Sequence, residues 1–338
     1  MCVIAAKYLK SGDPDNAEDD IGWVAVKCRD RNYYPTMFVK QNTIKDVEAT
    51  FIVDSISKYS EGINQYGVGI LNAATSVSND ESQITLARKY EKRKLAREGK
   101  YNDPDGIKIR RALRMKTPEE AAQSLIDDEM NGHTLIINQD KCLILEGGMT
   151  KKEWDYHSKL AKLNPEHVWG DTEYTYSLKE VPKDETIVRT NHGFDLPWLG
   201  YSSKNRKNTK QVLSRTSSEH RHDTVVENMK DAETVDEMIK AISDVSNPDP
   251  QLNPTRGGDY VKFKFKTTSQ LCIIPKNKEL ITIPIWSNTS AENFDKANSE
   301  DSATFFSIRP FRPYDKRKEE KKKVEESISF SDYLKNLR

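Results

Sequence analysis

Short apolar runs with the period of β-strands dominate the informative parts of the chain. Runs at Cys2–Tyr8 and Gly22–Cys28 predict a first hairpin, joined by an acidic loop at 13–15. Runs at 134–138 and 141–146 predict a second hairpin over a two-residue turn. Further strand-like runs lie at 51–53, 186–190, 260–265, 270–274 and 280–286, and a tight turn followed by a buried strand lies at 62–73.

Helical patterns separate these groups of strands. The stretch from 84 to 115 is basic and polar, which predicts one or two solvated helices around a break at 102–106. A helix start is predicted at Thr117, an N-cap residue followed by Pro118 and two acids. A second helical stretch leads from 219 through 242, and the charged tail from 315 predicts a peripheral helix or a partly disordered segment.

Strands that come in pairs, with helices between the pairs, favour an α+β fold with stacked antiparallel sheets over a doubly wound parallel sheet. The chain of 338 residues is long enough for a sizeable core. We therefore predict a single domain over 1–310, with a charged helical insertion at about 84–116 and a charged tail at 311–338.

The balance of charge narrows the function classes. Lys+Arg and Asp+Glu both number 53, so the formal net charge is zero and predicts neither a nucleic-acid partner nor an anionic membrane surface. The basic run at 88–97 is interspersed with acids, which favours a solvated helix face. No apolar run approaches the roughly 18 residues of a membrane span, and the N-terminus lacks a signal-peptide pattern. Four scattered cysteines without a CxxC pair predict a reducing, cytoplasmic location.

Cys2 is the most informative residue, because it directly follows Met1. Removal of Met1 would leave a thiol and a free α-amine on one residue. An α-amine titrates near neutral pH and can serve as the base for its own thiol, so the two groups form a nucleophile with a built-in base. An incidental second-position cysteine remains the alternative, and the rest of the chain has to support the hypothesis.

Four further segments stand in an order that supports it. They are Val26–Tyr33 with Arg29 and Asp30, Gly62–Gly69 with Asn64, Arg189–Gly193 with Asn191, and Ser217–Arg221 with Arg221. Together with Cys2 they resemble the N-terminal nucleophile hydrolases. The branch that they resemble most is the choloylglycine hydrolase and acyl-coenzyme A:6-aminopenicillanate acyltransferase group. The resemblance covers Cys2 to about Trp286 and implies a four-layer αββα sandwich.

The resemblance also implies roles for six residues. Cys2 matches the nucleophile, Asp30 the acid that holds its amine, and Arg29 an arginine that orients the site or lowers the thiol pKa. Asn64 matches a turn asparagine that contacts the oxyanion or the substrate, and Asn191 matches a carboxamide that donates to the oxyanion. Arg221 matches an arginine that braces the nucleophile. Two departures stand out: Cys28 replaces the usual asparagine, and Arg31 is a second arginine that competes with Arg29 for the position facing the site.

Other polar residues have simpler explanations. Cys28, Cys142 and Cys272 lie in apolar contexts and are expected to be inert. His192 is expected to be structural or to line the substrate rim, and His220 and His222 to pack or lie on the surface. The glycines of 62–69 lack the Lys-Ser/Thr of a phosphate loop.

The sequence thus predicts a cysteine hydrolase that cleaves a linear amide C–N bond of a small molecule through an acyl-thioester on Cys2. It predicts no metal, no organic cofactor and no processing beyond Met1. Acyl transfer to an amine and a catalytically silent binding or structural protein remain open, and the resemblance also allows a homo-oligomer. Aromatic residues predict an apolar acyl group; they are Trp154, Tyr156, Trp169, Tyr174, Trp198 and Tyr201.

Overall fold

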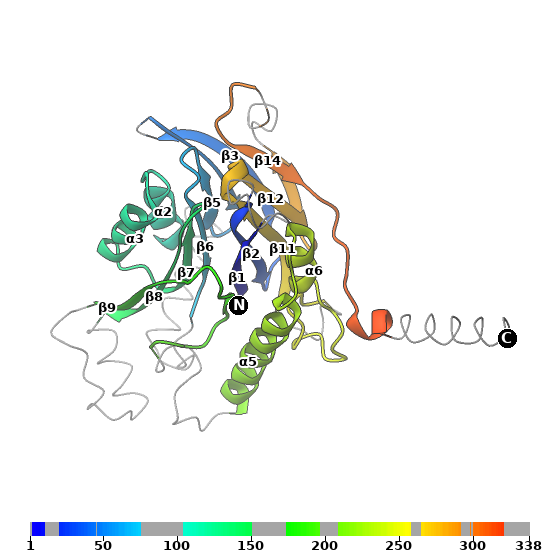
Figure 1. Cartoon of the computed structure of the whole chain (residues 1–338). Coiled ribbons are helices and arrows are strands. Elements are labelled where there is room, and N and C mark those ends of the chain that lie inside the picture. Colours follow the sequence, from blue (N-terminus) through cyan, green and yellow to red (C-terminus); the bar gives the residue numbers. More distant parts are fainter. Residues whose placement is uncertain are drawn as a thin grey trace.

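Side chains alternate between the two faces of β1 (Cys2–Leu9), and this alternation shows how the protein is layered. Ile4 points into a core between two stacked sheets, whereas Val3 and Ala5 point into a second core beneath helices. Successive residues of a strand point to opposite faces, so one strand serves both cores. Figure 1 shows β1 near the centre of the molecule.

The computed structural model describes most of the strands and helices. The described residues are 2–10, 20–44, 46–75, 104–150, 174–196, 209–257, 265–291, 298 and 300–320. Most of the predicted insertion, the predicted strand at 260–264, five of the six aromatic residues noted above and the end of the tail lie outside them. No described helix is long and apolar enough to cross a membrane.

Sheet A has six strands in the order β10-β1-β2-β11-β12-β14. The predicted first hairpin is confirmed, because β1 pairs antiparallel with β2 (Gly22–Arg31) along its whole length. The other members are β10 (Ile187–Arg189), β11 (Lys266–Ile274), β12 (Glu279–Pro284) and β14 (Phe305–Ile308); the short helix η2 (Pro275–Asn277) joins β11 to β12. All pairs are antiparallel except β12 with β14.

Sheet B has eight strands in the order β13-β3-β4-β5-β6-β7-β8-β9. Its strands are β3 (Thr36–Ile44), β4 (Val47–Asp54), β5 (Ser60–Asn64), β6 (Gly69–Ala73), β7 (Gly132–Ile137), β8 (Cys142–Thr150), β9 (Tyr174–Glu180) and β13 (Asn288–Ala291). The predicted second hairpin is β7–β8. Only the edge strand β13 pairs parallel, with β3.

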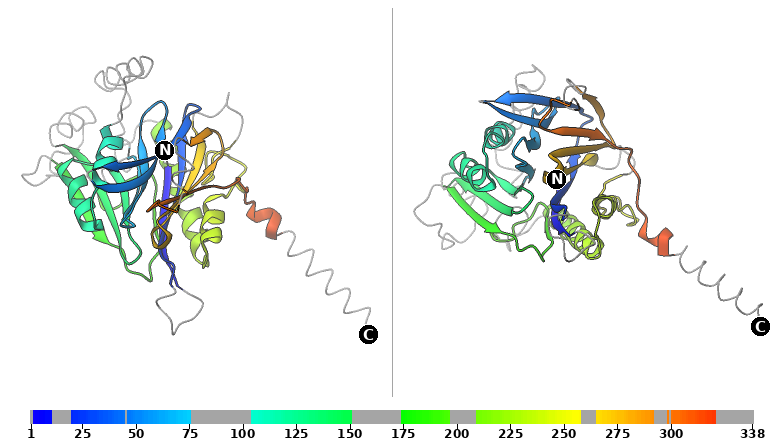
Figure 2. Two further views of the ribbon diagram at one scale, coloured as in Figure 1. Left: turned by 90° about the horizontal axis from the view of Figure 1, so that it is seen from above. Right: turned by 45° about the horizontal axis from the view of Figure 1, so that its top comes forward.

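Helices cover the outer face of each sheet. The helices α2 (Pro104–Ala112) and α3 (Pro118–Asp127) pack on sheet B, and α5 (Thr209–Met229) and α6 (Val235–Ile242) pack on sheet A. Figure 2 shows these layers, with α2 and α3 on one side and α5 and α6 on the other. Three separate cores fill the interfaces, one between the sheets and one under each helix pair. The fold is therefore α+β with the predicted αββα layering.

Helix ends follow the local sequence with two differences. Thr117 caps α3 as predicted, since its hydroxyl accepts a hydrogen bond from the Glu120 N–H. The break predicted at 102–106 is wrong for 104–106, because α2 begins at Pro104, a residue that the first turn of a helix tolerates; 102 and 103 lie outside the described residues. The helical stretch that was expected to reach 242 is divided, because Thr234 starts α6 with its own capping box.

Candidate active site

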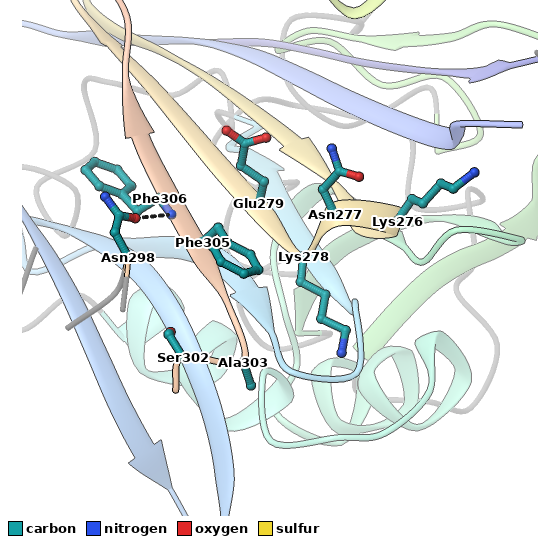
Figure 3. A pocket seen from close by; sticks show the side chains of 9 residues that line it. All are labelled: Lys276, Asn277, Lys278, Glu279, Asn298, Ser302, Ala303, Phe305 and Phe306. Atoms are coloured by element: carbon teal, nitrogen blue, oxygen red, sulfur yellow. Dashed lines mark hydrogen bonds between the residues drawn. The ribbon is translucent and has the colours of Figure 1, made fainter. Parts of the chain in front are cut away.

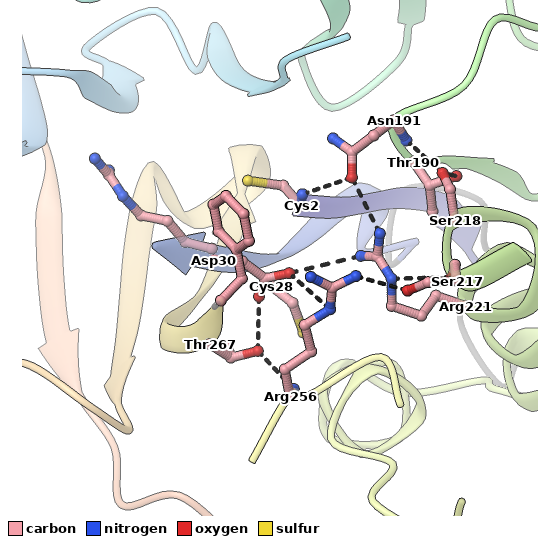
Figure 4. Close-up of polar contacts among 12 residues, drawn as sticks. Cys2, Cys28, Asp30, Thr190, Asn191, Ser217, Ser218, Arg221, Arg256 and Thr267 are labelled. Carbon is pink, nitrogen blue, oxygen red and sulfur yellow. Dashed lines mark hydrogen bonds and ion pairs between the residues drawn. The ribbon is translucent and has the colours of Figure 1, made fainter. Parts of the chain in front are cut away.

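Strand pairing places Cys2 at the end of β1, directly opposite Arg29 of β2. Its side chain belongs to the core between the sheets and is 3% exposed. Figure 4 shows the Cys2 nitrogen directed toward Asn191 and the sulfur on the other side. The two reactive atoms of this residue therefore lie in different surroundings.

Asn191 holds the nitrogen of Cys2. It follows β10, which pairs with β1, so the sheet brings residues that are 189 positions apart into contact. Its Oδ1 accepts hydrogen bonds from the Cys2 N–H at 3.0 Å and from Nη2 of Arg221 at 3.0 Å. Its Nδ2 donates to the carbonyl of Ala74 at 2.6 Å, which fixes the orientation of the carboxamide.

Behind Asn191 lies a buried polar group that we call the outer cluster: Asp30, Ser217, Arg221, Arg256 and Thr267. Nη1 of Arg221 lies 3.6 Å and Nε of Arg256 lies 3.5 Å from the same Oδ2 of Asp30. The hydroxyl of Thr267 donates to Oδ1 of Asp30 at 2.7 Å. All five residues are buried, so their charges have little access to water. The carboxylate of Asp30 is balanced by the two guanidinium groups and by the Thr267 hydroxyl.

The loop after Asn191 is anchored by a buried carboxylate on β8. Glu146 accepts hydrogen bonds from the backbone N–H groups of Phe194, Asp195 and Leu196 at 2.8–3.2 Å. Burial nevertheless raises the pKa of this carboxyl above its usual range. No sequence pattern points to this anchor, since Glu146 is one acid within an ordinary strand pattern.

On the other face of β2 lies a second group, which we call the inner cluster: Lys27, Arg29, Arg31, Asp54 and Glu61. Nζ of Lys27 donates to Glu61, and Nη2 of Arg29 donates to Asp54 at 3.1 Å. Nη1 of Arg29 lies 3.5 Å from Glu61, and Nε of Arg31 lies 3.4 Å from Asp54. Among the described residues, three cations from sheet A thus face two carboxylates from sheet B.

The charges of the inner cluster lower the pKa of the Cys2 thiol. Burial alone would raise the pKa of this thiol, but the charge of Lys27, then that of the α-amino terminus of the chain and then that of Arg31 oppose burial and lower the pKa from 9.0 to about 7. The thiolate is the nucleophilic form, so these cations favour the reactive state.

The other cysteines behave in the opposite way. Burial raises the pKa of Cys28 to about 12, and it raises the pKa of Cys142 and Cys272 further. The expectation that these three thiols are inert agrees with their burial. Cys2 alone among the four has a lowered thiol pKa.

Three of the predicted contacts differ in the structure. Asp30 points to the outer face of β2 and makes no direct contact with the Cys2 nitrogen. It is linked to that nitrogen indirectly, because Asp30 pairs with Arg221, Arg221 donates to Asn191, and Asn191 binds the Cys2 N–H. Arg29 lies opposite Cys2, but its guanidinium pairs with the acids of sheet B. The choice between Arg29 and Arg31 stays open, because Arg29 pairs with Cys2 across the strands whereas the charge of Arg31 contributes to lowering the thiol pKa.

Asn64 was predicted to donate to the oxyanion, and the structure corrects this. Its Nδ2 donates to the carbonyls of Leu113 and Met115 at 3.0 and 2.7 Å, and its Oδ1 accepts from the N–H groups of Tyr66 and Val68. Ile63 points between the sheets, so the next residue must point to the outer face, toward α2. Asn64 therefore braces a turn and the end of a helix.

The remaining histidine predictions can be compared directly with the structure. His192 is buried, and its Nδ1 lies 2.9 Å from the hydroxyl of Ser218 and 3.1 Å from that of Thr190, so it is structural. Nε2 of His220 contacts Asn247 at 3.0 Å, and His222 packs its ring near Phe194. Within the described part of the chain, no three His, Cys, Asp or Glu side chains gather as metal ligands.

Lys27 and Arg256 were both missed by sequence reasoning. The strand period carried a signal for Lys27, because Cys2, Lys27, Arg29 and Arg31 share one face once the hairpin register is known. Arg256 had no such signal, since it lies in an irregular segment between α6 and β11.

A cavity of about 720 Å³ lies at the far end of sheet A, and Figure 3 shows its lining. It is formed around η2 and the start of β14, with Lys276, Lys278 and Phe305 among its residues. It shares no residue with either cluster. Eight residues lie between Thr267 and Lys276, and the part of β11 from Thr267 to Ile274 alone spans roughly 23 Å at about 3.3 Å per residue. We assign it no part in the chemistry of Cys2.

Comparisons with known proteins add little. No protein-family model matches the chain, and no curated protein matches it. A solved structure of penicillin V acylase from Agrobacterium tumefaciens is similar over 92% of this chain and 98% of that chain, with 9% sequence identity and a TM-score of 0.33. A TM-score this low supports no conclusion, so the function is argued from the geometry of the site.

Proposed function

We propose that the protein is an N-terminal cysteine hydrolase that cleaves a linear amide C–N bond, with Cys2 as nucleophile after removal of Met1. One observation carries the proposal: the nitrogen of Cys2 is hydrogen-bonded into one buried polar network, and a second buried network of charges lies on the face of β2 that the sulfur shares. Asn191 and Arg221 hold the nitrogen, and the charge of Lys27 acts on the sulfur. A cysteine that served only the core would need neither network.

The chemistry follows from these contacts. The amine accepts the thiol proton, and the thiolate attacks the carbonyl carbon of the amide, forming a C–S bond. The tetrahedral intermediate collapses as the C–N bond breaks, and the leaving nitrogen takes the proton from the Cys2 ammonium. Water then attacks the thioester and returns a proton to the amine, the C–S bond breaks, and the acid is released with the thiolate restored.

The tetrahedral intermediate places negative charge on oxygen, which needs a nearby donor. Asn191 commits one Nδ2 hydrogen to Ala74, and the second hydrogen is the one we assign to the oxyanion. Loss of such a donor typically costs about 2.7–4 kcal/mol of transition-state stabilisation. Asn64 is not available for this task, because both of its donors bind backbone carbonyls.

The test starts with the intact mass of the purified protein, which should lack Met1. A cyanobenzothiazole probe, which condenses with a free 1,2-aminothiol, should then modify the chain at Cys2. Acylation by p-nitrophenyl acetate should label Cys2 and should be lost in Cys2→Ala. A retained Met1 in protein that still acylates at Cys2 would contradict the mechanism.

A catalytically silent protein with this fold is the second candidate, and the 3% exposure of Cys2 favours it. Such a protein would show no probe reaction in the folded state while reacting normally after denaturation. Hydrolysis and transfer to an amine are separated by product analysis with an added amine acceptor. The apolar acyl group stays a prediction, because Tyr174 is the only described member of its aromatic set, and its hydroxyl donates to the carbonyl of Met130.

A further inference from the structure

Arg256 is a buried guanidinium that the mechanism above does not use. It is 1% exposed, and Nη2 donates to the hydroxyl of Ser217 at 2.7 Å. Its backbone N–H donates to the hydroxyl of Thr267 at 2.7 Å, and that hydroxyl donates to Asp30. Burying such a large cation is costly unless its interactions offset the lost hydration, so its position calls for an explanation.

Two arginines converge on one carboxylate here. Arg256 and Arg221 approach the same Oδ2 of Asp30, and both also contact Ser217, one at its hydroxyl and the other at its carbonyl. Burial lowers the pKa of Arg221, and the charge of Arg256 lowers it further, to about 9. The charge of Arg256 is therefore felt at the residue that holds Asn191 against Cys2.

We propose that Arg256 is a positioning residue for the Cys2 amine: through Asp30 and Arg221 it holds Asn191 in place, and its positive charge favours the neutral, proton-accepting form of that amine. This inference rests on the proposed function, because it requires a free amine at Cys2. It assigns Arg256 no contact with substrate.

The sign of the effect follows from the charges around the amine. Arg221 approaches from α5 and Arg256 from the segment before β11. The strand β2 contributes the cations Lys27, Arg29 and Arg31 and the acid Asp30. Sheet B contributes Asp54 and Glu61, and the loop after β10 contributes the neutral Asn191. Positive neighbours disfavour an ammonium and negative neighbours favour it, so removing the charge of Arg256 should make the amine easier to protonate.

The experiment is a pH titration of protein labelled with ¹⁵N-cysteine. The amine nitrogen of Cys2 resonates far from the amide nitrogens of the other three cysteines, so its titration can be followed without any substrate. In Arg256→Met the midpoint should rise by about one pH unit, whereas in Arg256→Lys, which keeps the charge, it should stay within about 0.3 unit of wild type. In Asp30→Asn it should fall.

Opposite shifts in Arg256→Met and Asp30→Asn cannot come from a general loosening of the site. Equal midpoints in wild type and Arg256→Met, or shifts of both variants in one direction, would overturn the inference. If Arg256→Met does not fold, Arg256→Gln removes the charge while keeping a donor for Ser217, and the same shift is expected. Absence of an amine resonance in wild type would instead contradict the proposed function, so the two failures are distinguishable.

Discussion

The inner and outer clusters lie on opposite faces of the same strand, and they treat the two reactive atoms of Cys2 differently. The inner cluster pairs three cations of sheet A with two acids of sheet B and acts on the sulfur. The outer cluster joins sheet A to α5 and reaches the nitrogen through Asn191. Alternation along β2 therefore gives the sulfur and the nitrogen of Cys2 separate electrostatic surroundings.

The clusters also differ in how they hold their charges. In the inner cluster the charges pair directly across the gap between the sheets, with Tyr59 packed 5.2 Å from the Arg29 guanidinium. In the outer cluster hydroxyl groups also bind the charged groups: the Thr267 hydroxyl donates to Asp30, and the Ser217 hydroxyl accepts from Arg256. Changes in the first should alter thiol ionisation, and changes in the second should alter the position and protonation of the amine.

The largest effect is expected from Asn191→Ala, which removes the link between the outer cluster and Cys2. Acylation of Cys2 by p-nitrophenyl acetate should fall by about 10²–10³-fold, because a donor to the oxyanion and the partner of the amine are lost together. The midpoint for alkylation of the thiol by iodoacetamide should stay near pH 7, since Lys27 and Arg31 remain. If a changed midpoint of thiol alkylation accounted for the whole loss of acylation, the two clusters would not act separately on the nitrogen and the sulfur.

The next effect belongs to Lys27→Met in the inner cluster. The thiol pKa should return at least to about 8.5, so the thiolate fraction at pH 7 falls from about one half to about 3%, and iodoacetamide alkylation slows at least about 15-fold. The free energy of unfolding should also fall, by up to about 3 kcal/mol, because the buried Glu61 loses the closer of its two cationic partners and keeps Arg29.

Its control is Lys27→Met combined with Glu61→Gln, which removes both charges of the pair. Stability should recover in part, whereas alkylation should stay slow. Recovery of alkylation in the double variant would mean that the lysine acts only by holding Glu61.

A smaller effect is the pH profile of the wild-type protein. The thiol pKa of Cys2 is lowered, so its alkylation rate should rise with pH, pass half-maximum at about pH 7 and level off above it. Burial raises the pKa of Cys28 to about 12, so Cys28 should stay unmodified over the same range. Peptide mapping after iodoacetamide treatment of the folded protein distinguishes the two sites, and modification of Cys28 at pH 7 would contradict the assignment.

The smallest effect on Cys2 is expected from Asn64→Ala. It should lower the free energy of unfolding by about 2–4 kcal/mol, because four hydrogen bonds to backbone groups are lost, two of them buried and two partly buried. Alkylation and acylation of Cys2 should match wild type in protein that remains folded. A large loss of acylation without a loss of stability would mean that Asn64 does donate to the oxyanion.

Local features of the chain were predictable wherever short-range rules apply. The β1–β2 and β7–β8 hairpins follow from strand period and turn chemistry, and the start of α3 follows from Thr117 and Pro118. The prediction at 102–106 was wrong because Pro104 was taken as a break, although proline fits the first turn of a helix equally well.

Site residues were harder to assign, because residue type and order do not reveal which face a side chain occupies. Asn64 and Asn191 looked equivalent as turn asparagines, yet one points toward α2 and the other toward Cys2. Asp30 and Arg29 are neighbours in the chain, and they lie in different clusters because the strand alternates.

From its linear order alone, then, the chain specifies most of the described strands, the start of α3 and a cysteine at position 2. Folding adds the partners: Asn191 is 189 residues from Cys2, and the acids of the inner cluster belong to another sheet. Short-range periodicity encodes which residues share a face. It does not encode strand order or sheet stacking, which depend on burying apolar surface across the whole chain, and these decide which charges meet at the sulfur and which at the nitrogen.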